Sequence, residues 1–521
     1  MRAIAVIVLI ISVIIPIKHL LHMFQQNRYE VGRMVKWLKD NIGDEVKRMA
    51  PYTGAMILLV ILGFFAPDTA TVLALVVSVL WSLYSIKAES KRSYIKPLVY
   101  TARVKRQMIT IYVINALFIV CLVVGWGIRI PIACLIVPLM NYIWLFVMHF
   151  FNLPIEEMVK NKYLNEAKKI LADRSDLIKI GITGSYGKTS SKNIIQEVIS
   201  DRYFSLMTPG SYNTPMGITR TIREMLKPLH QVFVCEMGAD HVGDISYLCD
   251  FVKPTIGLVT SIGPQHLQTF GSQENIINEK MQMIEKLPPN GVGIINNDND
   301  FIRNYQVKNT CKLVSYGMDH EADYMAYDVS FGPTGSTFKV KGEGEEYEFE
   351  TKLLGRHNVD NILSAIVIGR QLGVTWKDLQ KAVKRVKYVE HRLEIKKING
   401  LTFIDDAFNS NPVGSAMALE VLSSMPGKRF IVTPGMIDLG ERQDEFNKEF
   451  GKKMKGCADE VILVGEKQTQ AIVQGLKEVG FDEEHLHVCK NVKGAFALVY
   501  QMADETSTIL LENDLPDAFN V

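Results

Sequence analysis

Residues 181–190, which read Gly-Ile-Thr-Gly-Ser-Tyr-Gly-Lys-Thr-Ser, constrain the fold of this chain more than any other segment. The apolar run Leu177–Ile182 predicts a strand, and apolar residues at helical spacing in Ser190–Ile199 predict a helix. Between them, Gly184 and Gly187 let the backbone turn tightly and bring its N–H groups close to an anion. A strand, a glycine-rich turn and a helix in this order predict a loop that binds the phosphates of a nucleotide.

The polar side chains of this loop indicate which atoms would hold the nucleotide. Lys188 can place its charge on the β- and γ-phosphates, and Thr189 can offer its hydroxyl to Mg²⁺. The first turn of the helix adds a partial positive charge. The spacing is shorter than that of G-x-x-x-x-G-K-[ST], so a chance turn before a helix is the competing interpretation. We expect ATP to be bound by Gly184, Ser185, Gly187, Lys188, Thr189 and Ser190.

Residues 1–152 contain long apolar runs of the length that a bilayer core requires, about 20 residues. A cleaved signal peptide or a soluble helical bundle would be the competing interpretations. No small-residue cleavage site follows the first run, and the runs are long and numerous, so we favour membrane spans. Five spans are expected, and four are the alternative because the second is short and glycine-containing. They lie near residues 3–23, 52–66, 69–86, 109–126 and 130–151.

The connectors between these spans differ in charge, which predicts an orientation. Residues 25–48 and 87–106 hold most of the Lys and Arg of this region, whereas the turns at 67–68 and 127–129 hold almost none. Basic connectors stay on the cytoplasmic side of a membrane. We therefore expect a multi-pass protein of the cell membrane, with everything after Phe151 in the cytoplasm, where ATP is available.

Strands and helices alternate through the remainder of the chain. Such alternation is typical of parallel sheets covered by helices. The expected architecture is an α-helical membrane bundle followed by α/β domains, with boundaries at 1–152, 153–388 and 389–521. A small antiparallel part is expected at 329–349, and a helix at 358–372. The expected strands are 231–235, 256–261, 291–296, 401–404, 429–433, 460–464 and 508–511.

Several polar residues follow the expected strands directly. Glu236 stands where a Mg²⁺ ligand beside a phosphate loop would be needed, although a solvated turn is the common role of such a residue. His266 occupies a similar position, and Lys280 lies on an expected helix. Two asparagines open the helix near 358, where capping would explain the first. The segment 405–412, Asp-Asp-Ala-Phe-Asn-Ser-Asn-Pro, is dense in polar groups.

Taken in order, these segments resemble the Mur ligases, the ATP-dependent amide-bond ligases of peptidoglycan precursor synthesis. The resemblance begins near Lys179. It rests on residues 183–190, 236–239, 266 with 280, 355–361, 391–394 and 405–412. The segments 405–412 and 436–440 are most similar to the branch that adds D-alanyl-D-alanine to a UDP-linked tripeptide. This implies a phosphate-loop central domain and a Rossmann-like C-terminal domain.

The family resemblance also implies roles for the matching residues, with ATP and Mg²⁺ as cofactors. The first Mg²⁺ would be held by Thr189 and Glu236, and a second by His266 and Lys280, which would carry the carbamate found in the family. Residues that would contact ATP in addition to the loop are Asn358 and Asn361 on the adenine side, and Arg392 and Asp405 at the γ-phosphate and ribose. The catalytic residues would be Lys188, Lys280, Arg392, Asn409 and Asn411.

The reaction implied is phosphorylation of a carboxylate by ATP, followed by attack of an amine on the acyl phosphate. The amine would belong to a peptide or amino acid, and the carboxylate to a UDP-linked or lipid-linked muropeptide. Net charge is +2, and 22% of residues are charged, so nucleic acid is not an expected partner.

The chain departs from the branch in three places: it has spans instead of a UDP-sugar domain, Phe408 instead of Tyr, and the acidic segment 511–516. A membrane-bound ligase of the poly-γ-glutamate type and a non-ligase membrane ATPase are the alternatives.

Overall fold

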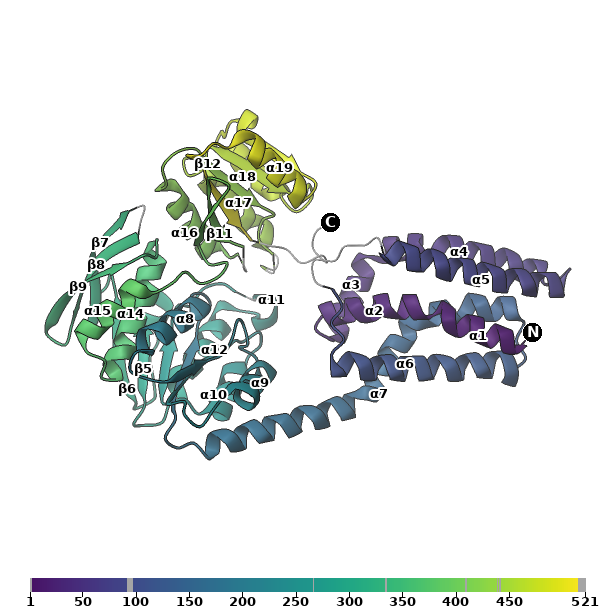
Figure 1. Cartoon of the computed structure of the whole chain (residues 1–521), viewed down its shortest axis with the longest axis horizontal. Coiled ribbons are helices and arrows are strands. Elements are labelled where there is room, and N and C mark those ends of the chain that lie inside the picture. The colour runs from purple at the N-terminus through teal and green to yellow at the C-terminus, as the bar shows by residue number, and fades with distance from the viewer. Residues whose placement is uncertain are drawn as a thin grey trace. The chain divides into compact units, whose positions relative to one another are not determined.

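The computed structural model describes residues 2–90, 97–265, 267–332, 335–407, 410–437, 439 and 442–513 (Figure 1). The described chain forms two compact units that meet between Asn161 and Lys162. The first unit is helical, and the second contains two β-sheets. The boundary falls within one long helix, α7, Ile130–Ala172.

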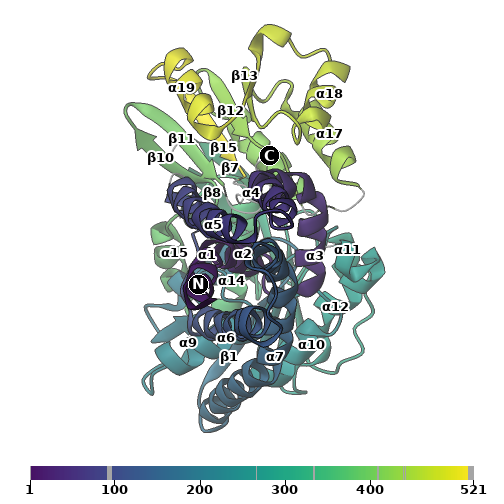
Figure 2. The same cartoon turned by 90° about the vertical axis from the view of Figure 1, so that its right-hand side faces the viewer.

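The first unit is a bundle in which α1 and α2 lie between two helix pairs, α4 with α5 and α6 with α7 (Figure 2). One side of α1 is buried, and residues 19–24 of α2 are all buried, whereas large apolar residues of the surrounding helices remain exposed. An exposed apolar surface of this extent is expected for a membrane bundle. The helices before α7 are α1 Arg2–Ser12, α2 Ile14–Gln26, α3 Val31–Asp40, α4 Ile42–Leu62, α5 Pro67–Ser90, α6 Ala102–Val120 and a π-helical turn Cys121–Gly125.

Among the residues that the structure describes, four helical segments are long and apolar enough to cross a membrane: Arg2–Gln26, Pro67–Ser90, Ala102–Gly125 and Ile130–Ala172. They correspond to four of the five expected spans, and to the number in the four-span alternative. The remaining expected span, 52–66, falls in the second half of α4 and the turn after it. Because its first turns are charged, α4 is not apolar enough to count among the helices that could cross a membrane.

Those charged turns of α4 are paired inside the bundle. Glu45 accepts hydrogen bonds from Arg48 and Tyr142, each at 2.5 Å, and its other oxygen lies 3.2 Å from Nε2 of His19. Burying charges is costly unless they are paired in this way. The pairing explains how α4 packs among apolar helices although it begins with charged residues.

The central domain is built on a nine-stranded sheet with the order β2-β3-β1-β4-β5-β6-β7-β8-β9. Neighbouring strands from β2 to β7 are parallel, and β7, β8 and β9 pair antiparallel, as expected for 329–349. The strands are β1 Ile178–Thr183, β2 Ser205–Met207, β3 Val232–Glu236, β4 Ile256–Val259, β5 Val292–Asn296, β6 Lys312–Gly317, β7 Tyr324–Gly332, β8 Gly335–Gly342 and β9 Glu345–Thr351.

Helices cover both faces of this sheet. One apolar core joins it to α8, α14 and α15, and another joins it to the end of α7 and to α9, α10 and α12. The helices are α8 Lys188–Ile199, α9 Pro215–Met225, α10 Asp244–Val252, α11 Leu267–Phe270, α12 Gln273–Glu285, α13 Asp300–Arg303, α14 Arg356–Gln371 and α15 Trp376–Arg385. This arrangement puts the loop after β1 at the carboxyl edge of the sheet, where ligands bind in such folds.

The C-terminal domain has a six-stranded sheet with the order β10-β11-β15-β12-β13-β14, parallel except for β10. Helices α16, α17 and α18 pack on one face and α19 on the other. The strands are β10 Glu394–Ile398, β11 Leu401–Asp406, β12 Arg429–Thr433, β13 Glu460–Val464, β14 Leu486–Cys489 and β15 Thr508–Glu512. The helices are α16 Pro412–Ser423, α17 Gln443–Met454, α18 Gln470–Glu478, a 3-10 turn Glu483–His485 and α19 Val492–Met502.

Candidate active site

The glycine-rich loop between β1 and α8 has the backbone shape that a phosphate-binding loop needs. Gly184 has φ of 151°, and a Cβ there would lie 2.2 Å from Oγ1 of Thr260. Gly187 has φ of 80°, and a Cβ there would lie 2.9 Å from Oδ1 of Asn361. Both positions therefore require glycine, for conformation as well as for space. Ser185 anchors the loop, since its N–H donates to the carbonyl of Ser261 at 2.6 Å.

Lys188 begins α8 and turns back over its own loop. Its Nζ donates to the carbonyls of Gly184 at 2.6 Å and Ser185 at 3.1 Å. Burial lowers the pKa of Lys188 to about 8, although the charge of Glu236 opposes this shift. A cation at the N-terminus of a helix, among backbone N–H groups, is a suitable partner for phosphate oxygens.

The two residues expected to share the first Mg²⁺ lie side by side. Oγ1 of Thr189 is 3.2 Å from Oε1 of Glu236, which is buried at the end of β3. The same carboxylate accepts hydrogen bonds from Lys192 at 2.8 Å and Asn213 at 3.0 Å. A hydroxyl facing a carboxylate is a donor set that suits Mg²⁺. Sequence reasoning missed Lys192 and Asn213; only the position of Lys192 one turn after Lys188 could have indicated it.

Lys280 is buried in the central domain, with its Nζ 3.4 Å from the carbonyl of Ala239 and 5.6 Å from the centre of the Phe270 ring. Burial and the charge of Lys188 lower the pKa of Lys280 to about 7. His266, its expected partner at a second Mg²⁺, lies outside the described residues. Within the described ranges, no group of three His, Cys, Asp or Glu could hold a metal ion.

The two asparagines at the start of α14 have structural partners. Nδ2 of Asn358 donates to the carbonyl of Leu354 at 2.8 Å, and Oδ1 of Asn361 accepts from Oγ of Ser191 at 2.9 Å. Asn361 thereby links α14 to the first turn of α8 beneath the glycine-rich loop. Their expected place beside adenine stays a prediction.

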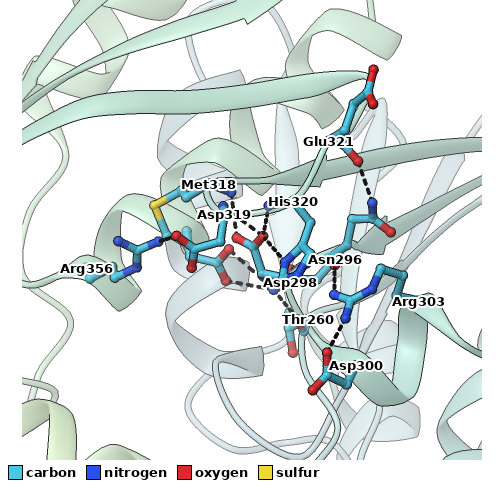
Figure 3. A network of polar contacts seen from close by, with 12 residues as sticks. Thr260, Asn296, Asp298, Asp300, Arg303, Met318, Asp319, His320, Glu321 and Arg356 are labelled. Carbon is cyan, nitrogen blue, oxygen red and sulfur yellow. Dashed lines mark hydrogen bonds and ion pairs between the residues drawn. The ribbon is translucent and has the colours of Figure 1, made fainter.

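A polar network lies next to this loop, at the carboxyl ends of β5 and β6 (Figure 3). Asn296 donates to the carbonyl of Thr260 at 2.9 Å and to Asp360 at 3.1 Å. Asp298 accepts backbone hydrogen bonds from the turn after β6, including that of Asp319 at 2.9 Å. Burial, with a further contribution from the charge of Asp298, raises the pKa of Asp360 to about 8. This edge of the sheet therefore presents neutral polar groups beside an anchored carboxylate.

The C-terminal domain contributes the remaining expected residues. Asp405 accepts from Lys396 at 2.7 Å and lies 2.8 Å from Nδ1 of His391. Burial lowers the pKa of Arg392, and the nearby carboxylates oppose that shift. Asn411 caps α16, accepting from the N–H of Gly414 at 2.8 Å. Asn409 and Phe408 lie outside the described residues, so the expected placement of the amine beside Asn409 and Asn411 stays a prediction.

Family models of two known domains match the central and C-terminal domains of this chain. Residues 182–369 match the Mur ligase middle domain, and residues 391–512 match the Mur ligase, glutamate ligase domain. The chain carries the middle and C-terminal domains of the Mur ligases. This confirms the resemblance inferred from the motifs, and it confirms the two α/β domains after a region of apolar helices.

Curated proteins that resemble these Mur ligase domains include two ligases of the same name from different bacteria. The UDP-N-acetylmuramoyl-tripeptide–D-alanyl-D-alanine ligase of Bacillus subtilis is 34% identical over 52% of this chain and 59% of the relative. The Escherichia coli protein of the same name is 30% identical over 56% of this chain and 65% of the relative. The chain thus spans about three-fifths of the length of the relatives it matches.

Solved structures show the same fold. MurF from Acinetobacter baumannii superposes with a TM-score of 0.61 and 24% identity, over 68% of this chain and 77% of that one. MurF from Thermotoga maritima, solved in complex with ADP, gives a TM-score of 0.62 and 23% identity, over 68% of this chain and 80% of that one.

One feature of the Mur ligase C-terminal domain was not predicted as a site. Asp406 and Glu512 are register partners at the carboxyl ends of β11 and β15, and Oγ of Ser410 donates to Glu512 at 2.5 Å. Burial raises the pKa of Asp406 to about 6 and that of Glu512 well above its usual range. The sequence marked 511–516 as acidic, but only strand pairing brings Glu512 to Asp406.

Proposed function

We propose that this chain is a membrane-anchored, ATP-dependent amide ligase of cell-wall precursor synthesis. The single observation that carries the proposal is the Thr189–Glu236 pair, with oxygens 3.2 Å apart beside a loop whose glycines cannot carry a side chain. This geometry suits a Mg²⁺–nucleotide complex. The match to both Mur ligase domains supports the ligase reaction over other uses of ATP.

Bound ATP and Mg²⁺ would supply the phosphoryl group that converts a carboxylate into a reactive acyl phosphate. Lys188 would bind the phosphates, leaving its carbonyl partners in the loop. Thr189 and Glu236 would hold the first Mg²⁺, and Lys280 would help to hold a second. Arg392 would bring positive charge from the C-terminal domain to the γ-phosphate. Because these residues come from two domains, closure of the domains would complete the site and exclude water.

The proposed substrates are an amine of a peptide or amino acid and a carboxylate of a muropeptide. The names of the relatives support a UDP-linked tripeptide and D-alanyl-D-alanine. The helical first unit supports a muropeptide presented at a membrane, UDP-linked or lipid-linked. We also propose that the chain is a multi-pass protein of the cell membrane with its ligase domains in the cytoplasm, because the basic connectors favour that orientation.

The first test is ADP release by the full chain in detergent, with Mg²⁺, UDP-N-acetylmuramoyl-tripeptide and D-alanyl-D-alanine, followed by mass spectrometry. We expect ADP and a pentapeptide product in equal amounts, and neither with Lys188→Ala. Strong ADP release without the two substrates would contradict the ligase proposal and favour a membrane ATPase. Ligation only when membrane lipid extract replaces the UDP-linked substrate would identify the carboxylate as lipid-linked.

A further inference from the structure

Lys192 is a buried lysine that none of the expected roles explains. It lies on α8, one turn after Lys188, and its side chain is 0% exposed. Its Nζ lies 2.8 Å from Oε2 of Glu236, whose side chain is 1% exposed. It also donates to the carbonyl of Gly210 at 2.5 Å. Burying a charge pair costs free energy that a pair of apolar residues would not, so the position calls for a reason other than stability.

The hydrogen bonds divide the two oxygens of Glu236 between different partners. Oε2 is bound to Lys192, whereas Oε1 faces Oγ1 of Thr189 at 3.2 Å and Nδ2 of Asn213 at 3.0 Å. The two oxygens of the carboxylate are therefore held by different partners. Oε1 is the oxygen that lies beside Thr189.

The same lysine joins three segments around Glu236. Its own helix, α8, carries the nucleotide loop, and Glu236 ends β3. The third segment, residues 208–214, contributes the carbonyl of Gly210 and the side chain of Asn213. This segment is tied back to β3, because the N–H of Gly238 donates to the carbonyl of Asn213 at 2.9 Å. Lys192 is thus the ionic centre of the support behind the carboxylate.

We propose that Lys192 is a positioning residue for the divalent cation, which holds Glu236 so that Oε1 alone faces the cation together with Thr189. The inference deepens the proposed function and rests on it for the identity of the cation as the Mg²⁺ that accompanies the nucleotide. A carboxylate fixed by a hydrogen-bonded neighbour keeps its orientation when the cation arrives, whereas a free one must be ordered at that moment. Lys192 also balances the charge of Glu236 while the cation is absent.

The test measures binding of Mn²⁺, a stand-in for Mg²⁺ with a paramagnetic signal, to the full chain in the presence of ADP. We compare the wild type with Lys192→Met, Glu236→Gln and the double variant. Loss of a group that orients a metal ligand weakens binding about 10- to 100-fold, which we expect for Lys192→Met. The double variant should bind no more weakly than Glu236→Gln, because Lys192 acts through that carboxylate.

Three controls separate positioning from general damage. Thermal unfolding checks that each variant is folded, and metal-free ADP binding should stay near that of the wild type because Lys188 is intact. Lys179→Met, which replaces a half-buried lysine on β1, should leave Mn²⁺ affinity unchanged. Lys192→Arg, which keeps the charge, should recover part of the affinity.

Wild-type Mn²⁺ affinity in folded Lys192→Met would overturn the proposal, as would additive losses in the double variant. The two proposals fail separately. Absence of ligation would overturn the proposed reaction, while the Mn²⁺ affinity of Lys192→Met alone decides the role of Lys192. A wild type that binds no Mn²⁺ with ADP would overturn both.

Discussion

At the scale of single residues, burial changes the chemistry of Lys280. Burial lowers its pKa to about 7, so its amine is largely neutral at pH 8 and largely protonated at pH 6. Only the neutral amine reacts with CO₂ to form the carbamate that the family resemblance implies. We therefore predict more ¹³C-carbamate at pH 8 than at pH 6 after exposure to ¹³C-bicarbonate, measured by NMR.

The control for this experiment is Lys286→Met, which replaces a lysine on the surface near the same helix, paired with Asp250 at 3.3 Å. It should keep the carbamate signal, whereas Lys280→Met should lose it. An equal signal in Lys280→Met would show that the carbamate forms elsewhere and would contradict the prediction.

Asp406 and Glu512 make a second prediction at this scale, about pH and stability. Burial raises both pKa values, so the folded state holds protons that the unfolded state releases above its ordinary carboxyl pKa, near 4. The free energy of unfolding should therefore fall as the pH rises from about 4 through about 6 and beyond. Glu512→Gln removes one of these acids and can still accept from Ser410. We predict that the variant has a smaller drop in thermal midpoint between pH 5 and pH 8 than the wild type; equal drops would refute this.

At the scale of elements, the loop between β1 and α8 depends on the conformation of Gly187. An alanine there would be strained at φ of 80° and would place its Cβ 2.9 Å from Oδ1 of Asn361. Strain of this kind costs about 1–3 kcal/mol, and the crowding would displace the loop from α14. We predict that Gly187→Ala lowers ADP affinity at least tenfold, as measured by calorimetry.

A matched control is available in the hairpin between β8 and β9. Gly344 has φ of 79°, and a Cβ there would meet nothing within 4 Å. Gly344→Ala should cost similar stability but leave ADP affinity unchanged. A comparable loss of affinity in both variants would mean that general destabilisation, rather than the loop, is responsible.

At the scale of the whole chain, α4 decides whether the proposed membrane topology has four spans or five. Its turn at 63–66 is held to the turn after α6, since Arg129 donates to the carbonyl of Gly63 at 3.0 Å. Midway along α4, Tyr52 lies 3.1 Å from Ser78 of α5. A helix that runs beside a span and reaches the same end crosses the same thickness of membrane. We therefore predict five spans, with α3 and the 63–66 turn on opposite sides of the membrane.

Labelling with a membrane-impermeant maleimide in intact cells tests this topology. Phe65→Cys should be labelled from outside and Lys39→Cys only after lysis, in a background where the exposed Cys121 is serine. Four spans without α4 would put both positions on one side. Identical labelling of the two would therefore contradict the five-span prediction.

The sequence alone determined the segments whose structure depends on neighbouring residues. The glycine-rich loop, the apolar strands such as β1 and β13, and the helical first unit follow from local conformation and from continuous apolar runs. Four strands, β2, β6, β10 and β14, were missed. They are short or mixed in polarity, and their strand form comes from pairing with neighbours rather than from their own residues.

Only the tertiary structure decided which polar groups meet. Thr189 and Glu236 are separated by 47 positions, and their pairing was expected from a known family pattern. Lys192 lies 44 positions from Glu236, and apart from its place one turn after Lys188 its local sequence does not distinguish it from a lysine in solvent. Glu512 lies 102 positions from Ser410 and was expected only as part of an acidic segment. Burial and strand order set the charge and orientation of these groups, and both properties arise from contacts between distant parts of the chain.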